Sequence, residues 1–388
     1  MSGVFTYPAI DRIVWGRPAA GVLAEEAARL DAKRVFLVAS GTMRRETGAV
    51  AAVEKALGTR LAGVYDRMPP HDPFLSILDA SAEARAVKAD LLVTFGGGSL
   101  TDGAKIMQIC LRHDVTTPQA LEGYALTVGA DGTITVPEFE GPEVRQITVP
   151  TTLSGGEFNP QATGTDERIQ AKRMFRHPLI VPRGIVYDAA VTIHTPEWLW
   201  LSSGMRAVDH CIEGICSVTA NPVSDATCIH ALKLLTGALR RCKADPDDLA
   251  ARQDCQLGTW LSLAGRRAGV EMGASHGIGH VLGGTCHVPH GYTTCVMLPS
   301  VLRYNKVAVA DRQALVAGTM GRPGEDAADV VEDLIAELGL PTRLSQVGVG
   351  AEQFENVAHH AMHEPPVHRN PRRIRSAADV VDILTMAA

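Results

Sequence analysis

Four histidines lie close together late in the chain. They are His276, His280, His287 and His290. His276 and His280 are four residues apart, so on a helix their rings project from one face. A proline and a glycine bracket His290 in what reads as a turn. One or two histidines are ordinary on a polar helix end. Four among small and apolar neighbours predict a functional site, because imidazole is the usual metal ligand and proton carrier near neutral pH.

A second polar pair precedes this segment. Arg206 and His210 are also four residues apart and share one helix face. Full exposure of that face to solvent is the alternative, but the intervening residues are mostly apolar. Two helices that each offer such a pair can meet in one cleft, so we expect the two pairs to form a common site.

A glycine run in the first half indicates nucleotide binding. Asp90–Phe95 reads as a buried strand, Gly96-Gly-Gly-Ser99 follows at once, and an apolar helix continues through Ile106–Leu111. In a strand–turn–helix unit, free backbone N–H groups and the helix dipole can hold a phosphate. The run is neither GxGxxG nor a P-loop, so a merely tight turn stays open.

The elements that would position these residues fall into two halves. The first half alternates strand-like and helix-like segments; its further expected strands are Arg34–Ser40, Gln146–Pro150, Pro178–Pro182 and Gly184–Asp188. Residues 113–146 are turn-rich and read as a surface excursion, with Gly129–Gly132 resembling a hairpin turn.

From about residue 196 the apolar residues recur at helical spacing. The expected helices are Met205–Cys216, Ser224–Arg241, Leu249–Gly269 and Ala327–Leu338. The pattern predicts a doubly wound α/β domain over residues 1–190 and an all-helical domain over residues 191–388, with a ligand cleft between them.

Composition excludes several classes of protein. The net charge of −6 argues against a nucleic-acid surface. No run approaches the eighteen apolar residues of a membrane span, and the N-terminus shows no signal peptide. The eight cysteines form no CxxC pair and read as reduced thiols. We therefore expect a cytoplasmic enzyme with a small-molecule substrate and neither membrane nor nucleic-acid partners.

Together these motifs resemble the iron-containing (group III) alcohol dehydrogenases over nearly the whole chain. The matching residues are Gly96–Ser99, Asp102, Lys105, Pro150–Thr152, His210, His276, His280 and His290. The resemblance implies a Rossmann-like nucleotide-binding domain, a helical catalytic domain, hydride transfer with NAD(H) or NADP(H), and a homodimer. It also implies that Gly97, Gly98 and Ser99 hold the pyrophosphate, while Asp102, Thr151, Thr152 and Lys172 line the rest of the cofactor site.

The same resemblance implies a metal held by one Asp and three His. The histidines are His210, His276 and His290, with His280 handling the proton, but the aspartate position holds Arg206. A guanidinium cannot deprotonate and adds positive charge, so Fe or Zn is disfavoured. On an ideal helix Asp209 points roughly 60° from Arg206 and about 100° from His210, so it would replace the missing carboxylate only if the helix rotated.

The maleylacetate reductases are the branch of this family that works without metal, and His71-Asp-Pro73 resembles their HxP element. His71 is therefore a candidate substrate-binding residue. We expect a metal-independent reductase of an oxo-acid or enedioate. Arg206 would stabilise charge on the conjugated oxygen or clamp a substrate carboxylate, and His280 would supply the proton. Arg206 should also disfavour the cationic form of the neighbouring histidines.

Three alternatives stay open: a metal-dependent alcohol dehydrogenase that tolerates Arg206, a lyase resembling dehydroquinate synthase, and a non-catalytic ligand-binding descendant. Cofactor preference is also open. These enzymes often place an aspartate against the ribose 2′-hydroxyl at the end of the first long strand, and this chain has Ser40 there. Without that acid a 2′-phosphate is not repelled.

Overall fold

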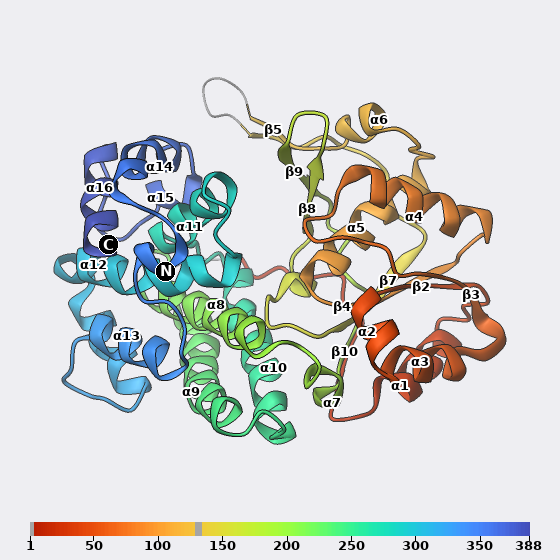
Figure 1. Cartoon of the computed structure of the whole chain (residues 1–388), viewed down its shortest axis with the longest axis horizontal. Coiled ribbons are helices and arrows are strands. Elements are labelled where there is room, and N and C mark those ends of the chain that lie inside the picture. The colour runs from red at the N-terminus through yellow and green to blue at the C-terminus, as the bar shows by residue number, and fades with distance from the viewer. Residues whose placement is uncertain (1–3, 129–133) are drawn as a thin grey trace. The chain divides into compact units, whose positions relative to one another are not determined.

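The computed structural model describes residues 4–128 and 134–388. Contacts divide the chain into two compact units. We call residues 7–194 the sheet unit, and residues 195–388 with the first six residues the helical unit. In Figure 1 the sheet unit runs from red to yellow-green and the helical unit from green to blue.

A six-stranded sheet is the centre of the sheet unit. All its paired strands are parallel, and their order is β1 (Arg12–Trp15), β10 (Gly184–Tyr187), β7 (Arg145–Pro150), β4 (Leu91–Gly96), β2 (Val35–Ala39) and β3 (Leu61–Tyr65). Every residue of β2 and β4 is buried, as expected for parallel strands covered on both faces. The α/β fold class expected for the first half is confirmed.

Helices cover the two faces of this sheet. They are α1 (Ala19–Arg29), α2 (Gly41–Glu46), α3 (Ala49–Leu57), α4 (Phe74–Ala86), α5 (Gly98–Arg112), α6 (Pro118–Glu122) and α7 (Ala189–Thr192). Successive side chains of β2 enter different apolar cores: Val35 and Leu37 pack with α1 and α3, while Phe36 packs with α4 and α5. Figure 1 shows these two helix pairs on opposite sides of the strands.

Two small hairpins extend this unit. They are β5 (Thr127–Val128) with β6 (Ile134–Thr135), and β8 (Gln161–Asp166) with β9 (Ala171–Arg176). The expected turn at residues 129–132 lies outside the described residues. The strand expected at Pro178–Pro182 is wrong: these residues form a turn and an irregular segment before β10. Proline lacks an N–H group, so a proline at each end leaves this run poorly suited to a ladder.

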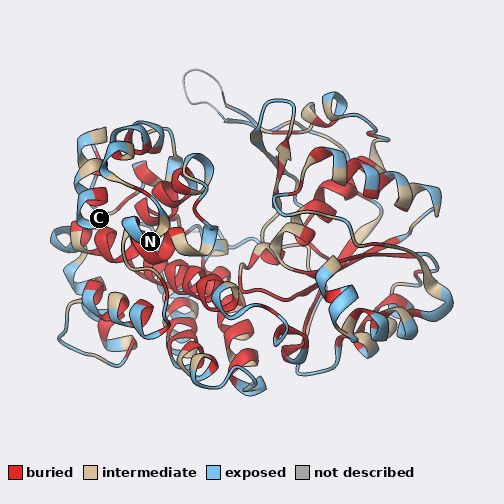
Figure 2. Ribbon diagram, viewed as in Figure 1, coloured by how far each residue is buried: buried red, intermediate tan, exposed pale blue. Residues whose placement is uncertain are grey.

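The helical unit is built around α8 (Glu197–Cys216). The other helices are α9 (Pro222–Ala244), α10 (Leu249–Ala264), α11 (Ala274–Thr285), α12 (His290–Thr319), α13 (Ala327–Glu337), α14 (Phe354–Ala361), α15 (Pro365–His368) and α16 (Ala377–Met386). Helices α9, α10 and α12 pack against α8, and every residue of α8 from Trp200 to its end is buried (Figure 2). A helix buried on all sides has little polar face, so charged residues on it need a specific reason.

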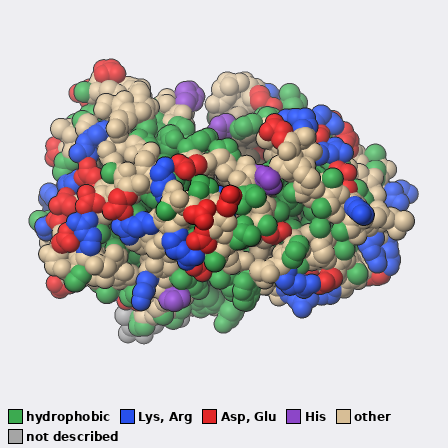
Figure 3. Space-filling model, turned by 60° about the horizontal axis from the view of Figure 1, so that its bottom comes forward, with side chains coloured by type: hydrophobic (Ala, Val, Ile, Leu, Met, Phe, Trp, Pro, Cys, Tyr) green, Lys and Arg blue, Asp and Glu red, His purple; other side chains and the backbone are tan. Residues whose placement is uncertain are grey.

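The surface drawn in Figure 3 carries both signs of charge. Lys and Arg side chains alternate there with Asp and Glu instead of gathering in one basic area. Among the described residues, no helix combines the length and the apolar character that a membrane span requires.

Candidate active site

The structure brings four histidines into one row within the helical unit. His210 comes from α8, His276 and His280 from α11, and His290 is the first residue of α12. Successive ring centroids are 5.0 Å, 6.5 Å and 6.1 Å apart in the order 210, 276, 280 and 290. His287 lies in the loop between α11 and α12 and is exposed.

A glycine lets α8 and α12 approach closely beside this row. A Cβ atom at Gly291 would lie 2.4 Å from Oγ and 2.6 Å from Cβ of Ser202 on α8, closer than real Cβ atoms come. His290 immediately precedes this glycine. Its position relative to α8 is therefore set by a contact that admits no side chain at the next residue.

Arg206 is buried one turn before His210. Its Nη1 donates a hydrogen bond to Thr294 Oγ1 on α12 (3.1 Å) and lies 3.6 Å from Asp209 Oδ2. The same Asp209 oxygen accepts hydrogen bonds from the hydroxyls of Ser275 (3.0 Å) and Thr294 (3.1 Å). Asp209 therefore reaches the histidine row without any rotation of the helix. The hydrogen bonds to Ser275 on α11 and Thr294 on α12 place this carboxylate between α8 and those two helices.

Glu213 is a site residue that the sequence analysis missed. Its Oε2 lies 2.7 Å from His276 Nδ1, and its two oxygens accept the backbone N–H groups of Gly273 and Ser275, each at 2.9 Å. The carboxylate thus fixes both the start of α11 and the ring of His276. Its spacing of seven from Arg206 was a usable signal, because residues at i, i+3, i+4 and i+7 share one helix face.

His210 and His276 are held neutral. Burial lowers the pKa of His210 and His276 well below 6.5, and the charge of Arg206 lowers it further. The expected effect of Arg206 is thus present, but burial is the larger cause. Burial also raises the pKa of Asp209 to about 6 and, together with the Asp209 charge, that of Glu213 to about 8.

Three buried polar atoms in the cluster have no hydrogen-bond partner within the described part of the chain. They are Nδ1 of His210, Nε2 of His276 and Oδ1 of Asp209. Buried polar groups are almost always paired in folded proteins, so a group left over at a cleft calls for a ligand or water. His276 Nδ1 faces Glu213 Oε2 at 2.7 Å, so Nε2 is the ring nitrogen left for a ligand.

His280 differs from the two buried rings. Its side chain is 41% exposed, its Nδ1 lies 3.0 Å from Oε2 of Glu364, and its ring stacks on His290 with 15° between the planes. Glu364 precedes α15 and was not anticipated from the sequence. An accessible imidazole oriented by a carboxylate is suited to carrying a proton between a ligand and solvent.

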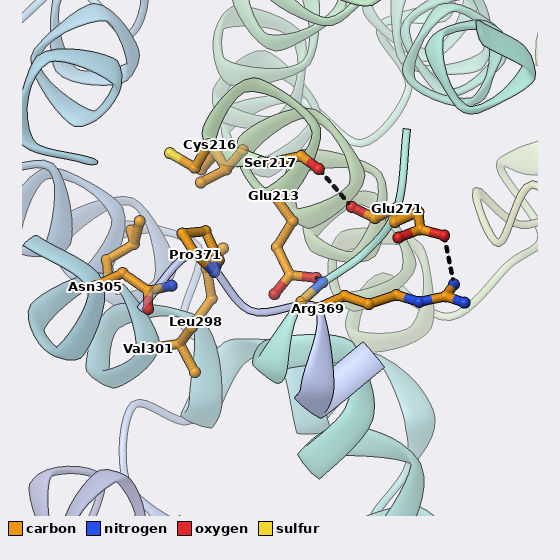
Figure 4. A pocket seen from close by; sticks show the side chains of 12 residues that line it. Glu213, Cys216, Ser217, Glu271, Leu298, Val301, Asn305, Arg369 and Pro371 are labelled. Atoms are coloured by element: carbon orange, nitrogen blue, oxygen red, sulfur yellow. Dashed lines mark hydrogen bonds and ion pairs between the residues drawn. The ribbon is translucent and has the colours of Figure 1, made fainter. Parts of the chain in front are cut away.

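A small pocket lies on the other side of Glu213 (Figure 4). Its lining includes Glu213, Ser217 and Asn305 but none of the four histidines. Near it, Arg369 pairs with Glu271 at 2.7 Å, as the dashed line in Figure 4 shows. This pocket therefore borders the back of the cluster and is separate from the histidine row.

In the sheet unit, the residues expected to bind a cofactor follow three adjacent strands. Ser40 follows β2, Gly97 follows β4 and Thr151 follows β7. The Ser40 N–H donates to Phe95 O and the Thr151 N–H to Gly96 O, each at 2.9 Å. Carboxyl ends of parallel strands share one edge of a sheet, and ligands of open α/β sheets bind there.

The turn into α5 leaves little room for side chains. A Cβ atom at Gly98 would lie 2.8 Å from Ser154 Oγ, and one at Gly97 would lie 3.4 Å from Thr152 Cγ2. No side chain caps the start of α5. Glycines at this position keep the backbone N–H groups accessible, so Gly97, Gly98 and Ser99 fit the pyrophosphate of a dinucleotide.

Asp102 and Lys105 have a structural partnership that the resemblance did not imply. The fully buried ammonium of Lys105 donates to Asp102 Oδ1 (2.8 Å) and to the carbonyls of Gly156 (2.7 Å) and Gln161 (2.8 Å). The other Asp102 oxygen accepts the Thr163 N–H at 3.2 Å. The pair therefore ties α5 to the β8–β9 hairpin.

The remaining candidates lie around that hairpin. Thr152 is buried and its Oγ1 lies 3.4 Å from Ser154 Oγ. Lys172 is an exposed residue of β9. His71 is exposed with a φ of 70°, and its carbonyl accepts the Thr165 hydroxyl at 2.7 Å. His71 thus has a defined backbone role, and its side chain's role stays a prediction.

A parallel sheet with a glycine turn at its carboxyl edge, followed by a helical unit with a row of four histidines of which two are buried, is typical of a nucleotide-dependent dehydrogenase. Two family profiles match: the iron-containing alcohol dehydrogenase profile over residues 11–189, and the C-terminal profile of the Fe-containing alcohol dehydrogenase family over residues 200–388. The chain belongs to the iron-containing alcohol dehydrogenase family and is an NAD(P)-dependent oxidoreductase.

Individual relatives lie within this family's reductase and dehydrogenase branches. Dehydrogenase FUM7 of Gibberella moniliformis is 32% identical, with 97% of this chain and 96% of the relative covered. A maleylacetate reductase of a Rhizobium species is 31% identical, covering 91% and 90%. The crystal structure of maleylacetate reductase from Agrobacterium tumefaciens superposes with a TM-score of 0.82 at 29% identity, covering 100% and 98%.

The family's name implies iron, and the residues present do not fit the family's ligand set. A buried guanidinium stands where the set needs a carboxylate, and it lies against the histidines that would be the other ligands. A different group, Asp209, Glu213 and His276, has ligand atoms within 4.8 Å of one another. Its carboxylates already accept two hydroxyl and two backbone N–H hydrogen bonds.

Proposed function

We propose that this protein is a metal-independent, NAD(P)H-dependent reductase of an oxo-acid or enedioate. Arg206 and the histidine row bind the reacting end of the substrate, and the turn into α5 binds the cofactor pyrophosphate. The maleylacetate reductases among the relatives support this reading over a general alcohol dehydrogenase.

The buried Arg206 is the observation that carries the proposal. Hydride addition to a carbonyl or conjugated carbonyl builds negative charge on oxygen, and a fixed cation in a water-poor site stabilises that charge. Metal-dependent relatives would use an ion for this purpose. Here a guanidinium that cannot deprotonate occupies the corresponding position, held by Thr294 and Asp209.

His280 is the proton donor in this proposal. It is an exposed member of the histidine row, as is His290, and Glu364 orients its ring. Proton transfer needs a group that exchanges with solvent between turnovers, which the two fully buried histidines do not do as readily. Neutral His210 and His276, together with His290, complete the polar lining of the site.

The cofactor contacts follow the sheet edge. When bound, the dihydronicotinamide supplies the hydride. Gly97, Gly98 and Ser99 bind the pyrophosphate, while Ser40, Asp102, Thr151, Thr152 and Lys172 line the remainder. Ser40 is neutral, so neither NADH nor NADPH is excluded at that position.

A metal-dependent alcohol dehydrogenase is the second candidate. It is favoured by one observation, the close approach of Asp209, Glu213 and His276. In that case a divalent ion would replace the hydrogen bonds that these carboxylates now accept, and activity would depend on it.

One experiment separates the two candidates. NAD(P)H oxidation is measured over a panel of oxo-acids, enedioates and aldehydes, with and without EDTA, alongside elemental analysis of the purified protein. The proposal expects activity that EDTA leaves unchanged and a roughly 10²–10³-fold loss in Arg206→Asp, as for removal of an oxyanion donor. Arg240→Asp, on a partly exposed ion pair of α9, is the control. One equivalent of Fe or Zn per chain, or activity lost to EDTA and restored by the ion, would refute metal independence.

A further inference from the structure

Ser40 occupies the position after β2 where NADH-binding sites usually have an acid. Its side chain caps α2, because its hydroxyl accepts the Met43 N–H at 3.4 Å. In the proposed cofactor site the adenosine ribose is bound at this point, where an aspartate would accept a hydrogen bond from the 2′-hydroxyl. A serine leaves the position open to a 2′-phosphate, but a serine alone does not supply the positive charge that a phosphate requires.

Ser40 also adjoins the turn that binds the pyrophosphate in the proposed function. Its N–H donates to Phe95 O on the neighbouring strand β4 at 2.9 Å. A Cβ atom at Gly96 would lie 3.4 Å from Ser40 Cβ, and Gly97 to Ser99 follow Gly96 immediately. The pyrophosphate and the adenosine ribose are directly linked in a dinucleotide, so a cofactor bound at this turn brings its 2′ position to the end of β2.

A guanidinium lies beside this position. A Cβ atom at Gly41 would lie 2.8 Å from Nη1 and 3.6 Å from Cζ of Arg45. The side chain of Arg45 therefore folds back over the residue that follows Ser40. Arg45 is exposed, and its side chain makes no ion pair or hydrogen bond within the described part of the chain. Its charge is thus available to a ligand.

The two acids nearest in the fold are engaged by the neighbouring arginine. Arg44 Nε lies 3.0 Å from Glu54 Oε1, and Arg44 Nη1 lies 3.1 Å from Asp66 Oδ2. Asp66 follows β3, the strand beside β2, so this ion pair neutralises the acid closest to the proposed ribose position. Glu46, next to Arg45 in the sequence, is exposed and forms an ion pair with neither arginine. Arg44 therefore stabilises the fold, whereas Arg45 has no such role.

We infer that Arg45 determines cofactor specificity: its guanidinium, together with Ser40, binds the 2′-phosphate of NADPH, and the enzyme prefers NADPH to NADH. This rests on the proposed function and deepens it, since Ser40 alone left both cofactors open. A guanidinium is always charged and donates two parallel hydrogen bonds to a phosphate. Because Arg45 is exposed, salt screens the interaction, so the preference for NADPH falls as ionic strength rises.

Equilibrium binding tests this without turnover. NADPH and NADH are titrated into the protein, and the fluorescence of the reduced nicotinamide gives Kd for each. Wild type is expected to bind NADPH at least tenfold more tightly at about 0.02 M salt, and this ratio should fall at least threefold at about 0.5 M salt. Arg45→Gln should lower the ratio at least tenfold, mainly by weakening NADPH. Arg17→Gln removes the same charge after β1, four strand spacings or about 19 Å from β2, and should leave the ratio unchanged.

Ser40→Asp is the reciprocal variant. Aspartate caps helices as well as serine does, so α2 should form normally, while the new charge repels the 2′-phosphate and reverses the preference toward NADH. Equal Kd values for the two cofactors in wild type overturn the inference, and so does a preference for NADPH that survives Arg45→Gln or high salt. Binding of neither cofactor overturns the proposed cofactor site as well. If NADPH binds preferentially but no carbonyl compound is reduced, the proposed reaction fails and the role of Arg45 stands.

Discussion

The pairing of Arg206 with Asp209 predicts a stability coupling that grows with pH. The perturbation is a double-mutant cycle of Arg206→Met and Asp209→Asn. With the pKa of Asp209 at about 6, its carboxylate is ionised above that pH and protonated below it. Without Arg206 the buried carboxyl keeps its proton to a higher pH. The free energy of ionisation in wild type is an upper limit to what Arg206 contributes, because Ser275 and Thr294 also favour the ionised form.

The magnitude follows from that pKa. One pH unit corresponds to about 1.4 kcal/mol, so ionisation at pH 7.5 is favourable by about 2 kcal/mol and at pH 5.5 by only about 0.2 kcal/mol. The coupling free energy in the cycle should approach these values and not exceed them. The effect of Asp209→Asn is measured once with Arg206 present and once with Arg206→Met. The interaction of Arg206 with the neighbouring histidines is the same in both members of each comparison, so it cancels.

Urea unfolding followed by tryptophan fluorescence measures the cycle. Three of the four tryptophans, Trp198, Trp200 and Trp260, belong to the helical unit, so the signal reports mainly on the unit that holds the pair. A coupling below about 0.5 kcal/mol at pH 7.5 would mean that the two charges do not stabilise each other. A coupling of equal size at both pH values would refute the assigned ionisation of Asp209.

Three further predictions concern other contacts. Gly291→Ala should lower kcat at least tenfold with unchanged cofactor affinity, because its Cβ would lie 2.4 Å from Ser202 Oγ. Gly237→Ala, whose Cβ would meet nothing within 4 Å, is the control. A kcat of Gly291→Ala equal to that of the control would contradict a role for this close contact in placing His290. Lys105→Met should destabilise the protein by about 3–5 kcal/mol in thermal unfolding, since it leaves a carboxylate without its buried cation; an unchanged Tm would be evidence against the tie. Glu213 has a pKa raised from 4.5 to about 8, so its contribution to stability is complete below pH 4.5 and is lost as pH rises through 8. The unfolding free energy of Glu213→Gln relative to wild type should therefore rise by about 1.4 kcal/mol per unit between pH 5 and 8, and parallel curves would refute this.

Much of the architecture was predictable from local patterns. The buried strands read at Arg34–Ser40 and Asp90–Phe95 are β2 and β4, because runs of apolar residues bounded by turns have few other solutions. The run at Pro178–Pro182 was misread because it is equally apolar. There the prolines, and not hydropathy, decide the backbone conformation.

The histidine row was predictable for the same reason, whereas the acids around it were not. His276 and His280 share a helix face by spacing alone, and the fold places both in the row. The angles of Asp209 to Arg206 and His210 on an isolated helix gave no reason to place it in the site. In the fold α8 contacts both α11 and α12, so Asp209 and Glu213 reach the site as well. Glu364 lies 84 positions after His280, so no local pattern connects the two.

The enclosure of α8 also constrains how such a site can change over generations. Arg206 and Asp209 are both buried, so neither side chain can turn to solvent. Replacing the arginine with a neutral residue would leave Asp209 buried without a counter-charge, and replacing the aspartate would do the same to Arg206. An exchange of a carboxylate for a guanidinium at position 206 therefore requires that positions 206 and 209 change nearly together. Otherwise the intermediate sequence has a buried unpaired charge and is less stable. We therefore expect these two positions to covary among relatives, with acids at 209 accompanying arginine at 206.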